Sequence, residues 1–139
     1  MADAFSLRVL TPERQLYDET AVQVTAEGTL GQFGVLADHV TFLTSLEPGP
    51  LSFQRPAGGE RTLAVKGGYA EVRDNVMTVL ADDALPIEAI DAAKAKADRD
   101  CAAEELAKAL AAHPFDHPER ERAERELRWA EVRIALARA

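Results

Sequence analysis

Two short segments of the chain bring together side chains that can carry chemistry. His113, Asp116 and His117 stand close together near the C-terminus, and imidazole and carboxylate groups are ligands of zinc-like ions. This segment is rich in proline and offers no fourth ligand nearby, so we expect no metal site there. Earlier in the chain Asp38 precedes His39, but adjacent residues of a strand point to opposite faces and would not converge as an acid–base pair. No catalytic constellation emerges, and we do not expect an enzyme.

Spaced glycines and a lone cysteine add no chemistry to this interpretation. Gly28, Gly31 and Gly34 superficially suggest a phosphate-binding loop, but no Gly-Lys-Ser/Thr sequence and no helix follow them. Cys101 is the single cysteine and cannot form an internal disulfide. It stands in an alanine-rich stretch, where we expect it to be a small buried hydrophobic side chain.

Composition narrows the class of partner. The 139 residues carry 16 basic and 24 acidic side chains and a net charge of −8, which argues against nucleic acid because phosphate binding needs a basic surface. No stretch has the length of a membrane span, and the N-terminus does not resemble a leader or transit segment. We therefore expect a soluble, intracellular protein that reaches a membrane only by binding other proteins.

Residues 1–85 show the period-two alternation of strands. Apolar side chains alternate with polar ones over Phe5–Val9, Val22–Ala26 and Met77–Ala81, among others, and Asp74-Asn75 has the composition of a hairpin turn. Pairs of glycine and proline punctuate the segment at short intervals. Many short strands without intervening helices predict an all-β, antiparallel β-sandwich.

Residues 86–139 show the composition of helices instead. Asp82-Asp83 and Pro86 fit the start of a helix that runs from Ile87 to about Ala112. The proline-rich segment 113–118 interrupts it, and Asp116 followed by Glu119 has the spacing of a capping box at the start of a second helix. Two helices of similar length joined by a short turn predict an antiparallel helical hairpin.

Both predicted helices carry more than one apolar stripe. In the second helix one stripe has coiled-coil spacing and the other is displaced around the axis. In the first helix Ala97 and Cys101 share a face with the preceding isoleucines, whereas Ala102, Leu106 and Ala109 share another. The stripes of the second helix are Ala123, Leu127, Ala130, Ile134 and Ala137, and Trp129, Val132 and Leu136. A free hairpin needs only one seam per helix, so the extra stripes indicate a second contact, with the sandwich or with another protein.

An ordered series of motifs resembles one known family. The series opens with Leu10–Arg14. Gly31–Leu51 follows, with spaced glycines, a histidine, a Thr-x-Leu and a Pro-Gly turn. A glycine-pair hairpin comes last, over Lys66–Val72 and Asn75–Asp82. Together these segments resemble the epsilon subunit family of F-type ATP synthases over most of residues 5–85, and the predicted hairpin has the size and place that the family gives it.

The resemblance implies a non-catalytic rotor subunit of a proton-translocating ATP synthase. The sandwich, residues 1–85, would bind the γ subunit and rest on the membrane ring of c subunits, through an interface that includes His39, Gly67, Gly68 and Tyr69. Gln32 stands where the family frequently has a glutamate that contacts the c-ring. The resemblance places the protein peripherally, on the cytoplasmic face of the bacterial inner membrane.

The family also implies a nucleotide motif in the first helix. Some members bind ATP through an Ile/Leu-Asp-x-x-Arg-Ala sequence, which Ile90, Asp91, Lys94 and Ala95 match with lysine in place of arginine. Lysine keeps the charge but loses the planar fork of donors. An intrahelical ion pair between Asp91 and Lys94 is the simpler interpretation, and no cofactor is required.

The hairpin, residues 86–139, would be the regulatory part. By resemblance, basic residues of the second helix meet the catalytic α/β subunits when the hairpin extends, and this contact inhibits ATP hydrolysis; Arg122, Arg125 and Arg128 are the candidates. Interleaved glutamates also allow a solvated, self-paired face.

A second function from another class fits the same elements. The chain would then be a small ligand-binding β-sandwich that dimerises through its helical hairpin. A tight homodimer would favour this alternative, whereas a monomer that captures γ would favour the rotor subunit.

Overall fold

The computed structural model describes residues 3–137, which form two compact units, Met1–Pro86 and Ile87–Ala139. The first unit is a β-structure and the second is helical, as the alternation of apolar residues predicts. Among the described residues, neither helix is long and apolar enough to cross a membrane.

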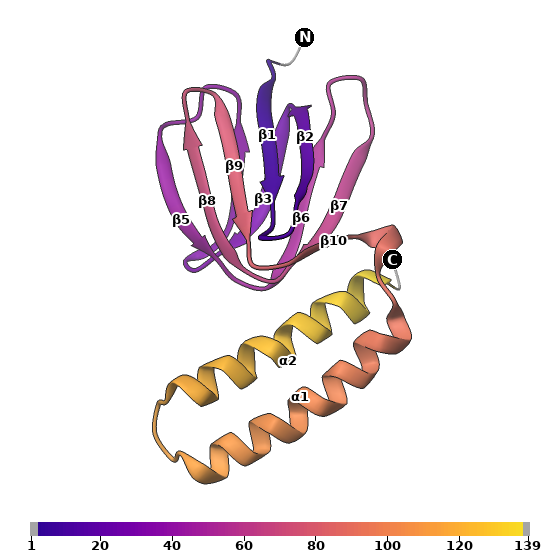
Figure 1. Cartoon of the computed structure of the whole chain (residues 1–139). Coiled ribbons are helices and arrows are strands. Elements are labelled where there is room, and N and C mark those ends of the chain that lie inside the picture. The colour runs from indigo at the N-terminus through magenta and orange to yellow at the C-terminus, as the bar shows by residue number, and fades with distance from the viewer. Residues whose placement is uncertain (1–2, 138–139) are drawn as a thin grey trace. The chain divides into compact units, whose positions relative to one another are not determined.

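The first unit consists of short β-strands (Figure 1). The burial of every second residue in β1 and β8 is what a sheet with one face on a core requires. The strands are β1 (Phe5–Leu10), β2 (Gln15–Ala21), β3 (Gln23–Gly28), β4 (Gly31–Leu36), β5 (Phe42–Leu46), β6 (Gly49–Gln54), β7 (Glu60–Val65), β8 (Gly68–Arg73), β9 (Val76–Ala81) and β10 (Ala84–Pro86).

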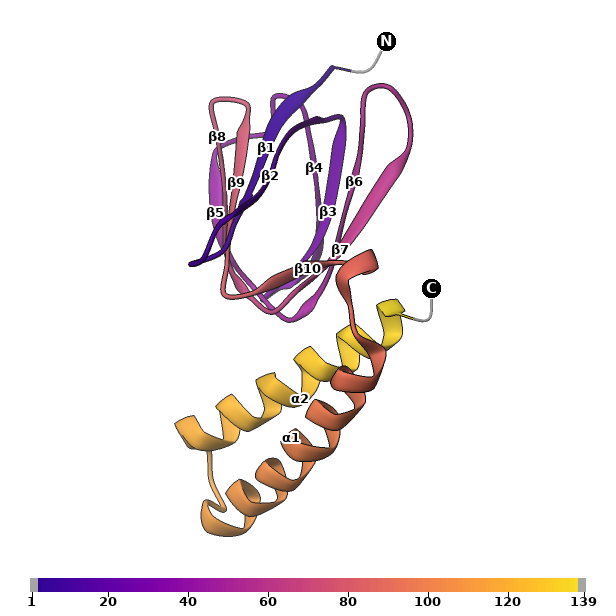
Figure 2. The same cartoon turned by 45° about the vertical axis from the view of Figure 1, so that its right-hand side comes forward.

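These strands form two facing layers, which Figure 2 shows from the side. One layer has the order β5-β8-β9-β1-β2 and the other has β10-β7-β6-β3, with β4 paired to β3. The layers join where Gly28 pairs with Leu46. The pairing is antiparallel throughout the described strands except between β1 and β9, which are parallel. The predicted β-sandwich is thus confirmed, with one parallel pair added.

The core lies between the layers. Tyr17 meets Phe53 edge-on, with ring centroids 5.5 Å apart, and both layers contribute fully buried aliphatic side chains. The largest of these side chains are Phe53, Leu7, Leu51, Leu63, Met77, Val9, Val24, Val35, Val72 and Val79. Burying an aliphatic or aromatic side chain of this size contributes roughly 1.5–3 kcal/mol, so this core is the main source of stability of the first unit.

The motif segment Gly31–Leu51 begins with a strand that the alternation of side chains did not predict. Gly31–Leu36 is β4, which pairs with β3 from Gly28↔Gly31 to Gln23↔Leu36. The two glycines within it hid the alternation, because glycine carries no side chain to mark a face. Only residues after Leu36 leave the sheet, at Asp38, whose backbone takes a positive φ of 59°.

The second unit is a helical hairpin, but its helices begin later than predicted. Ala84–Pro86 extends the sheet as β10, Ile87–Ala89 forms a single 3₁₀ turn (η1), and α1 spans Ala92–Ala112. The predicted start at Asp82–Pro86 is therefore wrong, because β10 pairs with β7 through contacts that local composition does not reveal. The N-cap is Asp91, whose carboxylate accepts the N–H of Lys94 at 3.1 Å.

The second helix, α2, spans Pro118–Ala137, and its first turn also differs from the prediction. His117 rather than Asp116 caps it, because the ring Nδ1 of His117 accepts the N–H of Glu119 at 3.2 Å and its carbonyl accepts two further N–H groups. Pro118 takes the first helical position, where its missing N–H costs nothing.

The hairpin packs mainly through small side chains. On α1 the buried residues are Ala95 and Ala102, and on α2 they include Ala123, Ala130 and Ile134. The seam predicted for α2 is thus buried in part, and the α1 face of Ala102 is the packed one. Ala97 and Cys101 are exposed, so the prediction of a buried cysteine is wrong.

A charged contact joins the two helices in the part of the hairpin that lies away from its turn. The guanidinium of Arg133 on α2 is almost fully buried and donates to the Asp98 carboxylate of α1 at 2.9 Å. The same group lies 5.0 Å from the Trp129 ring and donates to the Trp129 carbonyl at 3.3 Å. A buried cation with partners on two sides fixes the register of the helices.

Candidate functional site

Apolar side chains form a row across the outer face of one sandwich layer. Leu43 on β5, Tyr69 on β8 and Leu80 on β9 are 68%, 58% and 55% exposed. Tyr69 is paired with Leu80, and Leu80 with Leu10 of β1. Leu43 is paired with Glu71, two residues along β8 from Tyr69, so all four side chains share the face turned away from the core. We call Leu10, Leu43, Tyr69 and Leu80 the outer apolar row.

The outer apolar row is unusual for the solvent face of a sandwich. Antiparallel sheets that face water on one side normally place polar residues there. A contiguous apolar patch with charged neighbours is typical of a surface that binds another protein. Here Glu71 and Arg8 flank the row.

The sequence prediction included only Tyr69 of this row. Leu10, Leu43 and Leu80 lie in the segments that carry the family motifs but were not predicted as interface residues. For Leu80 the signal was available: in Met77–Ala81 the core phase of the alternation is Met77, Val79 and Ala81, so Leu80 is an apolar residue in the solvent phase.

Gly67 and Gly68 are buried and set the backbone path that leads to Tyr69. Both have positive φ, 144° and 125°. A Cβ on Gly68 would stand 2.0 Å from the carbonyl oxygen of Leu80, so only glycine fits there. Any interface role for these two residues is therefore exerted through the turn that presents Tyr69.

Gln32 and His39, both predicted interface residues, lie toward opposite ends of β4. Gln32 is exposed beside the β3–β4 turn, where Leu30 is 100% exposed. His39 lies beyond Leu36, so β4 alone separates the two by about 13 Å at a strand rise of roughly 3.3 Å per residue. They belong to two different surfaces. Leu30 was missed because nothing in Thr29-Leu30 distinguishes a tip residue from a strand residue.

His39 is held by its own loop rather than by an acid. Its Nδ1–H donates to the Val40 carbonyl at 2.8 Å, and its ring lies 5.0 Å from that of Phe42. The backbone N–H of Asp38 donates to the Asn75 side chain at 2.8 Å. These contacts tie the β4–β5 connection to the β8–β9 turn, which suits a residue that shapes a surface.

The residues of the nucleotide motif surround the start of α1. Asp91 is exposed, and one of its carboxylate oxygens accepts a hydrogen bond from the Lys94 backbone N–H. A helix cap thus takes the place of the predicted side-chain ion pair. Lys94 is exposed, Ile90 is half-buried, and Ala95 is fully buried. ATP binding stays a prediction.

Arg122, Arg125 and Arg128 are all exposed on α2. They follow one another at three-residue spacing, which keeps them on one broad side of the helix. Their positions are compatible with a basic contact surface, which also stays a prediction.

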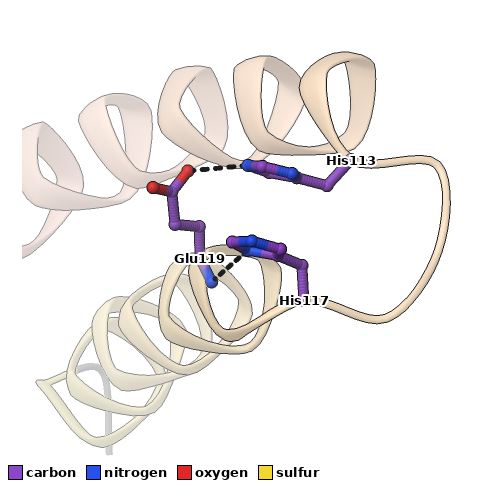
Figure 3. A group of neighbouring side chains, drawn as sticks. All are labelled: His113, His117 and Glu119. Atoms are coloured by element: carbon purple, nitrogen blue, oxygen red, sulfur yellow. Dashed lines mark hydrogen bonds and ion pairs between the residues drawn. The ribbon is translucent and has the colours of Figure 1, made fainter.

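The turn of the hairpin gathers the other two histidines of the chain (Figure 3). The rings of His113 and His117 are stacked, with centroids 3.6 Å apart and planes 7° from parallel. His113 Nε2 donates to the Glu119 carboxylate at 2.9 Å. That hydrogen bond, with the nearby charge of the ring, lowers the pKa of the Glu119 carboxyl. The predicted companion, Asp116, is not part of this cluster, and Glu119 takes its place.

Taken together, a sandwich with an apolar outer face and a helical hairpin define a protein that binds other proteins. The comparisons with known proteins agree. The family described as "ATP synthase, Delta/Epsilon chain, beta-sandwich domain" matches residues 4–87. The chain belongs to this family, as the motifs of residues 5–85 predicted.

Relatives and a solved structure support the assignment over both units. An ATP synthase epsilon chain of Desulforapulum autotrophicum is 45% identical over 104 residues, covering 71% of this chain and 77% of the relative. One of Syntrophobacter fumaroxidans is 37% identical over 137 residues, covering 99% and 98%. In a cryo-EM structure of the Euglena gracilis mitochondrial ATP synthase (OSCP, F1 and c-ring), one chain matches with a TM-score of 0.75 and 25% identity, covering 97% of this chain and 82% of that one.

Proposed function

We propose that this chain is the non-catalytic adaptor of an ATP synthase rotor, which binds the γ subunit through its sandwich and transmits the rotation of the c-ring. Family membership and the names of the relatives support this function over a ligand-binding sandwich that dimerises. The observation that carries it is the outer apolar row, an exposed apolar surface on a sheet whose other face already holds a complete core.

The outer apolar row is the part of the sandwich best suited to γ. Its side chains stand on four neighbouring strands of a rigid sheet, so little conformational freedom is lost on binding. Large apolar and aromatic side chains near the centre of an interface contribute most of the binding energy. Tyr69 and Leu80, directly paired across β8 and β9, form that centre.

Charge substitutions within the row test the proposal. Leu80→Glu places a carboxylate at the centre of the surface, whereas Thr20→Glu places the same charge on the same layer at its far strand, β2. We expect L80E to weaken capture of the cognate γ subunit at least tenfold, since a hot-spot residue contributes about 2 kcal/mol or more. T20E should bind like the wild type.

Binding is measured by titrating purified γ or the γ-containing F1 complex with the purified chain. Circular dichroism first establishes that both variants are folded. Unchanged γ binding by a folded L80E chain would rule out the outer apolar row as the γ surface. A pull-down of the α, β and γ subunits from membranes tests the assembly as a whole.

A second surface, at the other end of β4 from His39, is proposed to meet the c-ring. It consists of the β3–β4 turn with the fully exposed Leu30 and of Gln32 on the adjoining strand. An exposed apolar tip is a surface on which another protein can dock, and the Gln32 amide beside it can form hydrogen bonds with that partner. On this proposal the chain lies peripherally at the cytoplasmic face of a bacterial inner membrane.

The hairpin is proposed to regulate ATP hydrolysis. Arg122, Arg125 and Arg128 would contact the catalytic α/β subunits when the hairpin extends, and a two-state element of this kind is biased by whichever partner binds one state better. Replacing the three arginines with glutamine should raise the hydrolysis rate of the reconstituted complex if the contact is inhibitory. Equal rates would argue against it.

ATP is proposed as a regulatory ligand of the segment from Ile90 to Ala95. The exposed Lys94 supplies the positive charge, although Asp91 is already engaged as the cap. Equilibrium dialysis with labelled ATP tests the idea, and Lys94→Gln should abolish whatever binding is seen. Absence of binding at millimolar nucleotide would end it.

A further inference from the structure

We propose that the turn of the hairpin is a binding site for a divalent transition-metal ion of the zinc type, with His113, His117 and Glu119 as its protein ligands. One ligand atom from each of these residues lies within 4.8 Å of the others. The three residues come from both helices, since His113 ends α1, His117 caps α2, and Glu119 lies in the first turn of α2 (Figure 3).

The separations are close to those of a formed site. Metal–nitrogen bonds of 2.0–2.1 Å and tetrahedral angles put two ligand atoms roughly 3.3 Å apart. The Glu119 oxygen is 2.9 Å from the nitrogen of His113, and the ligand atoms of all three residues lie within 4.8 Å of one another. An imidazole nitrogen binds an ion in the plane of its ring, whereas the rings of His113 and His117 are stacked with planes 7° from parallel. Binding of one ion by both rings therefore requires rotation of at least one of them.

The donor set selects the kind of ion. Two imidazoles and one carboxylate suit zinc, nickel or copper, whereas magnesium and calcium prefer oxygen ligands. Three protein ligands leave a position for water, as in open sites. His113 and His117 are half-buried and Glu119 is exposed, so an ion from solution can reach the cluster.

Metal binding would replace the present hydrogen bonds in a defined way. The ion takes the place of the proton on His113 Nε2, now shared with Glu119, and the neutral ring then carries its proton on Nδ1 instead. A neutral imidazole has one lone pair, and that of His117 now accepts the Glu119 N–H. This lone pair passes to the ion, so the Glu119 N–H loses its cap acceptor and turns to water.

The ion would act as a clip between α1 and α2. It binds only where the two helix ends are together, so the stability of the hairpin rises with the logarithm of one plus the ratio of the ion's concentration to its dissociation constant. This inference rests on the geometry of the turn and does not depend on the rotor function.

The test uses the full-length, untagged chain freed of metal with a chelator. Zinc chloride is titrated by calorimetry, and the same samples are followed by amide NMR and thermal unfolding. We expect one zinc ion per chain, a large shift of the Glu119 amide resonance, and a rise in the hairpin's unfolding temperature. Magnesium chloride should produce none of these changes.

Matched variants separate the site from its surroundings. His117→Asn removes the imidazole but keeps a side chain that caps helices well, and Glu119→Gln keeps the shape of the third ligand. Each should weaken zinc binding at least about tenfold, since even indirect support of a metal ligand contributes 10–100-fold. Asp116→Asn changes a carboxylate in the same turn outside the cluster and should bind zinc as the wild type does.

Several results would contradict the proposed zinc site. Zinc binding that survives in both H117N and E119Q, or that is lost in D116N, would place the ion elsewhere. Heat of binding without a shift of the Glu119 amide would do the same. No binding by the folded wild-type chain at millimolar zinc would overturn the proposal outright.

Discussion

Single residues in this protein act mainly by fixing the backbone or closing a contact between elements. Gly68 lets β8 begin against β9, and Arg133 holds α1 to α2. Asn75 links two loops, because its side chain accepts from the Asp38 N–H and donates to the Ala4 carbonyl. None of these residues belongs to the outer apolar row, but Gly68 fixes the backbone that presents Tyr69 in it.

Gly68→Ala tests whether the β7–β8 turn requires a glycine at this position. The added Cβ meets the Leu80 carbonyl at 2.0 Å and the backbone carries a φ of 125°, so the sheet must shift. We expect a loss of about 3 kcal/mol or more in the free energy of unfolding. Gly58→Ala is the control: its φ is 94° but no atom lies within 4 Å, so strain alone, about 1–2 kcal/mol, should appear. Chemical denaturation followed by circular dichroism measures both, and equal losses would contradict the steric account.

Removing the acid of the Asp98–Arg133 contact should lower stability more than removing the base. Asp98→Asn leaves a nearly buried guanidinium without its carboxylate and should cost about 1–3 kcal/mol. Arg133→Met removes the buried charge and leaves Asp98, which is 42% exposed, to water, so it should cost less. Trp129 is the sole tryptophan and stands on α2, so its fluorescence reports the hairpin. A greater loss in R133M than in D98N would show that packing of the arginine, rather than its charge, matters.

At the scale of elements, the sequence predicted what local patterns determine and missed what partners supply. The alternation in β1 and β9 and the turn at Asp74-Asn75 were predicted from their residues alone. The start of α1 was not, because β10 is a strand only by pairing with β7. The cap of α2 was misplaced because a histidine ring took the role that Asp116 was expected to fill.

The interface residues show the same division. Tyr69 was predicted through resemblance, and Leu80 could have been found from the alternation of Met77–Ala81. Leu43 became visible only once the register showed which side of the layer faces the core. Likewise, the histidines of the hairpin turn were recognised as metal-ligand types. Their third partner, Glu119, was missed because it reaches back from α2 to the end of α1.

The cap of α1 can be tested at the level of the helix. Asp91→Ala removes the acceptor for the Lys94 N–H and should cost about 1 kcal/mol of hairpin stability. Asp91→Asn retains an acceptor and should cost only a few tenths. Thermal unfolding followed by Trp129 fluorescence gives both values. If D91N were as damaging as D91A, the carboxylate charge rather than the hydrogen bond would be responsible.

At the scale of the whole molecule, the two units differ in the kind of core they possess. The sandwich buries many large side chains between its layers. Four of the buried residues described in the hairpin are alanines, and the others are Trp129, Arg133 and Ile134. Alanine contributes little apolar area, and helices gain most of their stability from packing. The sandwich should therefore be the more independent unit.

Truncation tests this difference. A chain ending at Pro86 keeps β10 against β7 and should fold cooperatively, with the amide dispersion of the intact sandwich. A chain ending at Asp83 loses β10, exposes the edge of β7 and should be less stable and prone to association. The peptide 87–139 should be only partly helical by itself.

Both tyrosines lie in the first unit and the tryptophan in the second, so tyrosine and Trp129 fluorescence follow the two units separately in the full chain. We expect Trp129 to report unfolding at lower denaturant than the tyrosines; coincident transitions would mean that the hairpin unfolds only together with the sandwich, and the hairpin could not then switch as a separate regulatory element.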